Sequence, residues 1–271
     1  MNAIGTRPLR RLHAVFRTVV FTWSAHLTMS SANASLLIVS PHFDDAVFSC
    51  ADWMARQPDV LVGTVFTATP AESPMHTDWD ARCGFVDAEQ AMRARFAEDD
   101  RALSLLHAHA LRLGFLDRQY GERPAVDAVA QAIDALVVAH RCGTVMIPLG
   151  LCHPDHDLVH CACLRVLKEN PQLRWLGYEE APYRRVEGLV QGRLIMLADN
   201  EIVATPFAMQ ASVGGHSGKT ASDDVAELTR RAVAAYQSQL LGFDAPDTAE
   251  FYLPGRYWTL VHAPAGLRAA T

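Results

Sequence analysis

Residues 36–45 read LLIVSPHFDD, an uninterrupted apolar run that passes into a proline, a histidine and two aspartates. An apolar run of this length is typical of a strand that is buried on both faces. Residues 145–156 read VMIPLGLCHPDH and repeat the arrangement later in the chain. In both stretches, imidazole and carboxylate groups follow the strand at a turn stiffened by proline. The two stretches therefore predict one metal site, assembled where two strands end at the rim of a sheet.

Elsewhere the chain alternates apolar strands with amphipathic helices. We expect further strands at residues 60–68, 111–115, 193–198 and 257–263, and helices at residues 46–57, 87–107, 126–140, 158–168 and 223–241. Residues 69–82 are rich in turns and are expected to overhang the site. Strands that are apolar throughout and alternate with helices predict an α/β fold with a mostly parallel sheet covered on both faces. Ligands bind such sheets at the carboxyl ends of the strands, where both histidine-containing stretches and Asp117 lie.

The composition favours a single domain that acts on a small molecule. The chain has 271 residues, of which 50% are hydrophobic, enough for one substantial core. Its formal net charge of −6 offers no basic surface for nucleic acid. Cysteines in a chain of this length do not form the disulfide framework of a small secreted domain, so we expect free thiols and a cytoplasmic protein. The cysteines are Cys50, Cys83, Cys142, Cys152, Cys161 and Cys163.

The first 34 residues differ from the rest of the chain. No acidic side chain precedes Asp44, and arginines lie among apolar residues. This composition is similar to that of a weak signal peptide, although its apolar run is short. We expect residues 1–34 to be a leader, with residues 1–28 either disordered or an over-extended start, and the domain to occupy residues 35–271. No later segment approaches the length of a membrane span.

Three residues of the two stretches supply the ligands of a hydrolytic metal site. Such a site needs three protein ligands and one open position for water, and His42, Asp45 and His156 form that set. His42 and Asp45 stand three residues apart where a strand turns into a helix, so both side chains can converge on one ion. We expect one Zn²⁺ per chain. Two histidines and one carboxylate also describe a non-haem iron site, so Fe²⁺ or another divalent ion stays open.

Asp44 and His153 are the expected catalytic residues. Asp44 is adjacent to a ligand in sequence and points elsewhere, which leaves it free to act as a general base on water. His153 precedes His156 by three residues and could remain unligated, facing a substrate carbonyl. As an imidazolium it would stabilise an oxyanion or protonate a leaving amine.

The segment Pro41-His42-Phe43-Asp44-Asp45, together with His153-Pro154-Asp155-His156, resembles the two signature motifs of the LmbE-like, or PIG-L, family of zinc-dependent N-deacetylases. The resemblance extends in order over roughly residues 35–165. It implies a Rossmann-like α/β fold and the roles given above for the ligands, the base and His153. It also implies removal of an acetyl group from the N-acetylglucosamine unit of a glycoside or another amino-sugar conjugate.

Two further segments match the same family. Residues 95–98 resemble its Arg-x-x-Glu segment, whose arginine points towards substrate hydroxyls, and residues 114–117 resemble the strand end whose aspartate binds sugar hydroxyls. The resemblance therefore implies that Arg95 and Asp117 bind substrate. From the residues alone, without the family resemblance, Arg95 could instead lie on a solvated helix face and Asp117 could cap a turn. Leu151 stands where the thiol-biosynthesis members carry a mobile tyrosine, a departure that concerns the substrate.

The sequence thus predicts a cytoplasmic, zinc-dependent hydrolase that removes an N-acetyl or longer N-acyl group. A zinc-dependent hydratase of an unsaturated dicarboxylic acid on the same fold is the main alternative, because several arginines are available to hold carboxylates. An iron oxygenase and a sugar-binding module without catalysis are further alternatives. The sugar, the acyl group, the aglycone and homo-oligomer formation stay open. The arginines that could hold the carboxylates in a hydratase are Arg82, Arg93, Arg95, Arg184 and Arg185.

Overall fold

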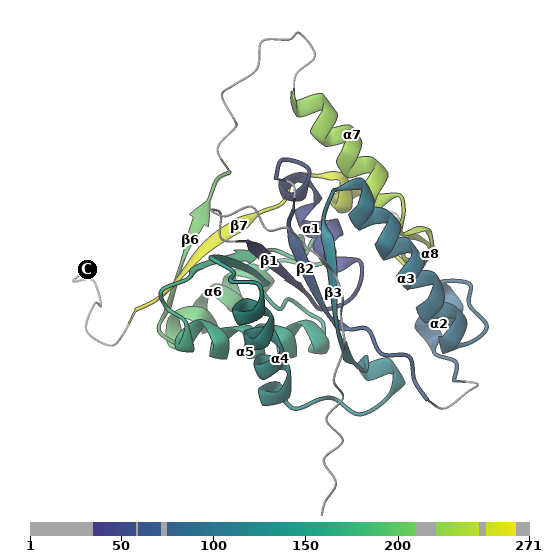
Figure 1. The fold of residues 1–271 in the computed structure, drawn as a ribbon, viewed down its shortest axis with the longest axis horizontal. Helices are drawn as coiled ribbons and strands as arrows, with labels where there is room; N and C mark the ends of the chain where they lie inside the picture. Colours follow the sequence, from purple (N-terminus) through teal and green to yellow (C-terminus); the bar gives the residue numbers. More distant parts are fainter. Residues whose placement is uncertain (1–34, 58, 72–74, 210–220, 244–247, 264–271) are drawn as a thin grey trace, which may run out of the picture. The chain divides into compact units, whose positions relative to one another are not determined.

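The computed structural model describes residues 35–57, 59–71, 75–209, 221–243 and 248–263 (Figure 1). The leader that we predict at residues 1–34 lies outside the described residues. Within the described part of the chain, no helix combines the length and the apolar character that a membrane crossing requires. All of the cysteines are free thiols, in agreement with the prediction from composition.

The described residues form one seven-stranded sheet of order β3-β2-β1-β4-β5-β7-β6 (Figure 1). Strands β3, β2, β1, β4 and β5 run parallel to one another, and β7 and then β6 add antiparallel strands at one edge. The predicted mostly parallel α/β sheet is therefore confirmed. The strands are β1 (Leu36–Ser40), β2 (Leu61–Phe66), β3 (His109–Phe115), β4 (Thr144–Pro148), β5 (Arg174–Tyr178), β6 (Ile202–Phe207) and β7 (Tyr257–His262).

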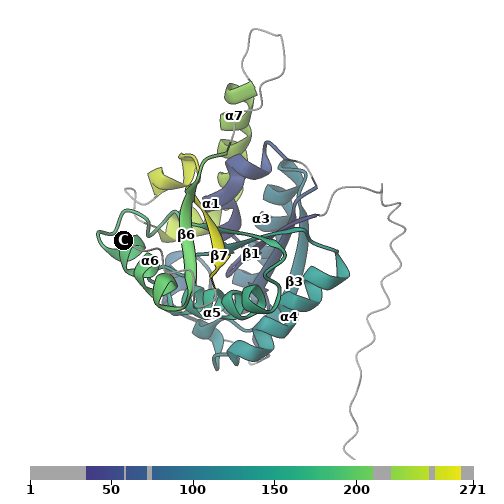
Figure 2. The same ribbon diagram turned by 90° about the vertical axis from the view of Figure 1, so that its left-hand side faces the viewer.

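Helices cover both faces of this sheet (Figures 1 and 2). Leu36 and Ile38 of β1 pack in a core with α1, α3 and α7, whereas Leu37 and Val39 pack in a second core with α4, α5 and α6. Side chains alternate across a strand, so only a continuous apolar run can fill two cores at once. The helices are α1 (Asp45–Met54), α3 (Ala88–Leu105), α7 (Ala221–Val233), α4 (Val126–Ala139), α5 (Pro154–Glu169) and α6 (Leu189–Asp199), with two short ones, α2 (Asp78–Arg82) and α8 (Gln237–Gly242).

The direction of chain connection reverses between β1 and β4. From β1 the chain continues to β2 on one side, while β4 pairs with the other side of β1. The carboxyl ends of these two strands lead into residues 41–44 and 149–153, which contain the two histidine-containing stretches. A crevice forms at such a switch point because the loops diverge to opposite faces. The topology therefore places both motifs at one position on the sheet edge.

Several predicted elements differ from the structure. The strand predicted at residues 193–198 is part of α6, a helix that buries Val190 and Leu197 while Ile195 remains 63% exposed. An apolar run of leucine, methionine and alanine favours a helix as readily as a strand, and length alone could not separate the two. The helix predicted at 223–241 is two helices, α7 and α8, separated at Tyr236. The buried Tyr236 hydroxyl bonds at the break to the Phe43 carbonyl oxygen, at 3.0 Å.

The helix predicted at residues 158–168 begins earlier, at Pro154. Proline is well suited to the first helical turn because its missing N–H group has no partner there in any case. The His153 side chain caps the helix, with Nδ1 accepting from the Asp155 N–H group at 3.2 Å. The second motif therefore lies on the first turn of a helix, and its side chains have fixed directions.

Candidate active site

The loop after β1 is held in place by its own hydrogen bonds. The buried Ser40 hydroxyl donates to the His42 carbonyl oxygen at 2.5 Å and accepts from the Ala46 N–H group at 3.0 Å. The Phe66 N–H group of β2 donates to the Pro41 carbonyl oxygen at 2.9 Å. These bonds connect the end of β1 to the start of α1 and to the neighbouring strand. His42 and the following aspartates therefore lie on a rigid turn.

The predicted ligands His42, Asp45 and His156 meet with their donor atoms in a nearly equilateral triangle. Asp45 Oδ2 is 3.2 Å from His42 Nδ1 and 3.2 Å from His156 Nε2, and the two ring nitrogens are 3.3 Å apart. A tetrahedral ion with ligand bonds of about 2.0–2.1 Å requires donor atoms about 3.3 Å apart. The residues present therefore fit a divalent ion in tetrahedral coordination, with one position left for a fourth ligand.

Each ligand histidine turns its other ring nitrogen towards a carboxylate. The fully buried Glu180 places Oε1 3.4 Å from His156 Nδ1. For His42, Nε2 lies 3.5 Å from Asp155 Oδ2 and 3.6 Å from Asp117 Oδ2. Carboxylates in this position fix the orientation and tautomer of a metal-binding imidazole. The structure thus brings together the predicted ligands and the carboxylates that would orient them.

Glu180 and Asp155 belong to this cluster but are not among the residues predicted from the sequence. Asp155 lies inside the second motif, and Glu180 is one of two glutamates directly after β5. The signal in the sequence that points to Glu180 is a carboxylate at the end of a parallel strand, the same feature that predicts a site role for Asp117. The Glu180 Oε1 atom also accepts from the Gly150 and Leu151 N–H groups at 2.7 and 2.9 Å. Glu180 therefore anchors the loop that carries the second motif as well as its histidine.

The electrostatics of the three ligands favour a bound cation. Burial opposes the charge of Asp45, but His156 and His42 outweigh it and hold the Asp45 pKa well below its usual value. Burial also opposes the charged form of His156 and by itself would lower its pKa. The carboxylates of Asp45 and Glu180 outweigh burial and raise the pKa of His156 to about 9. The carboxylates in the site thus draw positive charge onto the imidazoles. A metal ion would take the place of those protons.

The two predicted catalytic residues lie beside the triangle. Burial and the neighbouring Asp45 carboxylate raise the pKa of Asp44 to about 7. Asp44 precedes α1, yet its side chain makes no capping hydrogen bond there. Burial and the positive potential of His42 and His156 lower the pKa of His153 to about 4. The His153 ring is 5.3 Å, centroid to centroid, from each ligand histidine.

All of the predicted site residues line one cavity of about 490 Å³. Arg95, however, is not on a solvated helix face: it is only 5% exposed and donates to Asp80 Oδ1 and to the Tyr120 hydroxyl, both at 2.7 Å. Asp117 does cap a turn, since it accepts from the Gln119 N–H group at 2.9 Å. The predicted residues in the cavity wall are His42, Asp44, Asp45, Arg95, Asp117, His153 and His156.

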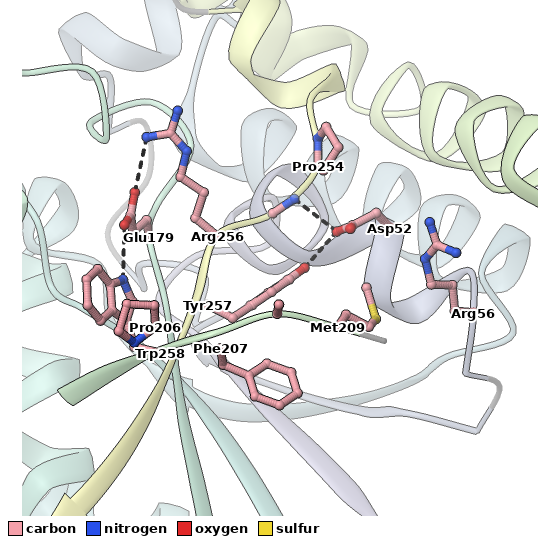
Figure 3. Close-up of a pocket in the computed structure, with 12 residues that line it drawn as sticks. Asp52, Arg56, Glu179, Pro206, Phe207, Met209, Pro254, Arg256, Tyr257 and Trp258 are labelled. Atoms are coloured by element: carbon pink, nitrogen blue, oxygen red, sulfur yellow. Dashed lines mark hydrogen bonds and ion pairs between the residues drawn. The ribbon is translucent and has the colours of Figure 1, made fainter. Parts of the chain in front are cut away.

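A second hollow of about 480 Å³ lies between the end of α1 and the turn that leads into β7 (Figure 3). Its buried Asp52 accepts from the Tyr257 hydroxyl at 2.6 Å, and its Glu179 accepts from the Trp258 indole N–H group at 3.0 Å. The described residues that line it include no histidine. The ligand set for a metal ion therefore belongs to the first cavity.

Comparisons with known proteins agree with this geometry. The family model described as PIG-L, GlcNAc-PI de-N-acetylase, matches residues 37–167. The comparison with curated proteins found no match. Solved structures share the fold. A triple mutant of a deacetylase of the teicoplanin biosynthetic pathway is 23% identical, with a TM-score of 0.67 over 86% of this chain and 100% of its own.

Two other solved structures extend the comparison. The A40926 pseudoaglycone deacetylase Dbv21 is 21% identical, with a TM-score of 0.65 over 86% of this chain and 99% of its own. The 4-carboxy-2-hydroxymuconate hydratase GalB of Pseudomonas putida KT2440 is 13% identical, with a TM-score of 0.53 over 84% and 95%. Both signature motifs lie inside the matched residues, so residues 37–167 form a domain of the PIG-L (LmbE-like) family, and the protein is an enzyme that acts on an amide bond.

Proposed function

We propose that this enzyme is a metal-dependent N-deacylase that removes an N-acetyl or longer N-acyl group from an amino-sugar conjugate. The observation that carries the proposal is the triangle of donor atoms in the same cavity as Asp44 and His153. Zn²⁺ is the proposed ion, because two imidazoles and one carboxylate at these separations suit its tetrahedral preference. When bound, such an ion supplies Lewis acidity that activates water and polarises the amide carbonyl.

Asp44 is the proposed general base. Its side chain lines the cavity next to the ligand Asp45 and makes no cap bond, so the carboxylate is available to a water molecule. Asp44 takes one proton from the attacking water and later delivers it to the amide nitrogen. The C–N bond then breaks, and the products are a carboxylic acid and a free amine.

His153 is proposed to bind the carbonyl oxygen of the substrate. Its Nδ1 atom accepts from the Asp155 N–H group at 3.2 Å, so the ring proton resides on Nε2. That N–H group can donate to the carbonyl oxygen and stabilise the negative charge that develops there. The ring is 39% exposed at the side chain, which leaves its outer edge open to a ligand.

The substrate is proposed to be an amino sugar because three consecutive polar residues line the cavity. Asp117, Arg118 and Gln119 follow β3 there, and they provide both donors and acceptors for hydroxyl groups. The matched family is described as acting on GlcNAc-PI, and solved structures of the same fold include deacetylases of the teicoplanin biosynthetic pathway. These two sources support a sugar carrying an N-acyl group.

The hydratase alternative receives less support from the cavity. A dicarboxylic acid needs cations, and among the described lining residues the arginines are Arg95 and Arg118. The Arg95 charge is already paired with the buried Asp80. Of the other arginines considered, Arg184 is buried against Glu250 and Arg93 pairs with Glu89 on the surface. A carboxylate would also face Asp44 and Asp45, which repel it.

The test is release of free amine from a panel of N-acylglucosaminides by zinc-loaded protein. We expect turnover by the wild type, and a loss of about 10²–10⁴-fold for Asp44→Asn with the metal content unchanged. Near-normal turnover by Asp44→Asn would refute the general base. If the zinc-loaded wild type releases no amine but hydrates an unsaturated dicarboxylic acid, the hydratase replaces the deacylase.

A further inference from the structure

The cavity has two unlike walls. Its polar wall consists of Asp117, Arg118 and Gln119. Of the large apolar side chains that line the cavity, Phe43, Phe66 and Met92 are buried in the core, whereas Trp79 and Phe243 are half-buried; we call Trp79 and Phe243 the apolar wall. Both are aromatic, and such side chains provide large areas for apolar contact. The proposed chemistry at the metal ligands uses neither of them.

Trp79 of α2 is held in place from several sides. Its indole N–H group donates to Gln239 Oε1 of α8 at 3.2 Å, and its ring meets Phe243 edge to face with 5.2 Å between centroids. Thr77 caps α2 and donates to Gln119 Oε1 at 2.8 Å, which ties this helix to the polar wall. The half-buried indole therefore has a fixed orientation, as expected of a surface prepared for a ligand.

We propose that the apolar wall binds the acyl group and that the preferred acyl group is longer than acetyl. This inference rests on the proposed function, because it assumes an amide bond placed at the metal ligands. The amide divides its substrate into an amine side and an acyl side. With the sugar on the amine side at the polar wall, the half-buried rings of Trp79 and Phe243 are left for the acyl side.

The size of the cavity supports a longer chain. An acetyl group has the volume of about two water molecules, roughly 60 Å³. The cavity measures about 490 Å³ and must also hold the sugar. An acetyl group would reach little of the apolar wall, whereas a medium-length aliphatic chain would cover it and remove its aromatic surface from water.

Hydrolysis of N-acylglucosamines with acyl chains of two to ten carbons tests the proposal. Each methylene that enters the apolar wall should raise kcat/KM by about fourfold until the wall is filled. Trp79→Ala should flatten this dependence, so that the ratio of the eight-carbon to the two-carbon substrate falls at least tenfold. Trp258→Ala, in the hollow of Figure 3, removes the same side chain elsewhere and should keep the wild-type ratio.

A second variant covers the case in which Trp79→Ala does not fold. A Cβ atom at Gly242 would lie 2.7 Å from the Trp79 ring, so Gly242→Ala should displace the indole without removing it. We expect the best chain length to change in this variant. N-acetylglucosaminides with an octyl aglycone form the competing arm. If they gain in kcat/KM and the long acyl chains do not, the wall binds the aglycone and the proposal is wrong.

Binding separates this inference from the deacylase proposal. Calorimetry on Asp44→Asn should show tighter binding of N-octanoyl than of N-acetylglucosamine, with a negative heat-capacity change from apolar burial. Equal affinities would overturn the inference even if amine release is observed. Tighter binding of the octanoyl compound without amine release by the wild type would support the apolar wall and refute the deacylase.

Discussion

Replacing Glu180 with glutamine tests how the structure prepares the metal ligands. Glu180 is fully buried, and its Oε1 atom lies 3.4 Å from His156 Nδ1. The same oxygen accepts from the Gly150 and Leu151 N–H groups. Glutamine preserves an oxygen acceptor for both N–H groups and removes only the charge. The loop should therefore keep its position while His156 loses the anionic partner that orients it.

Loss of such a carboxylate typically lowers metal affinity by 10–100-fold, or about 1.4–2.7 kcal/mol of binding free energy. Folding should change little, because glutamine occupies a similar volume and no buried N–H group loses its acceptor. Glu180→Ala should differ in this respect. It would leave two buried N–H groups without an acceptor, at a cost of about 1–3 kcal/mol each in unfolding free energy.

The assay is a competition titration for Zn²⁺ against a chromophoric chelator, with thermal unfolding of the metal-free protein beside it. Glu179→Gln is the matched control, since this neighbouring buried glutamate faces the second hollow and bonds to Trp258. We expect a Kd increase of at least tenfold for Glu180→Gln and less than twofold for Glu179→Gln. Equal Kd values for Glu180→Gln and the wild type would refute the orienting role of Glu180.

Other predictions concern the ligands, the arginine and the pH dependence of stability. His156→Ala should lose stoichiometric Zn²⁺ by elemental analysis; full retention of the ion would contradict the ligand assignment. Asp80→Asn should raise KM more than it lowers kcat, because Arg95 loses the ion pair that holds it at 2.7 Å in the cavity wall; an unchanged KM would show that Arg95 does not bind substrate. Burial lowers the pKa of His160 to about 4. The unfolded chain, with a pKa near 6.5, then binds more protons, so stability is full above pH 6.5 and falls by roughly 3 kcal/mol as the pH drops to 4. Denaturant unfolding should show a shallower fall for His160→Gln, and identical slopes would exclude this residue as the cause.

The tertiary structure corrected some sequence-based interpretations for physical reasons. Arg95 has charged neighbours in sequence and could have lain on a solvated helix face, but it is buried because Asp80 and Tyr120 supply its hydrogen bonds. Residues 193–198 form a helix because that conformation turns Leu197 and Leu194 towards the core, whereas Ile195 and Met196 stay exposed. Neither result follows from local pattern, since both depend on what a distant segment places opposite the residue.

What the sequence determined by itself is the local geometry of the motifs. A continuous apolar run can satisfy two cores only as a central parallel strand, and the turn after it brings His42 and Asp45 together at a spacing of three residues. The same reasoning located His156 and Asp117 at strand ends. Only the tertiary structure decided that Glu180 faces His156, and that Gln239 holds Trp79 across 160 positions of sequence. Periodicity reports which face of an element is buried; which side chains meet across that face depends on how whole elements pack.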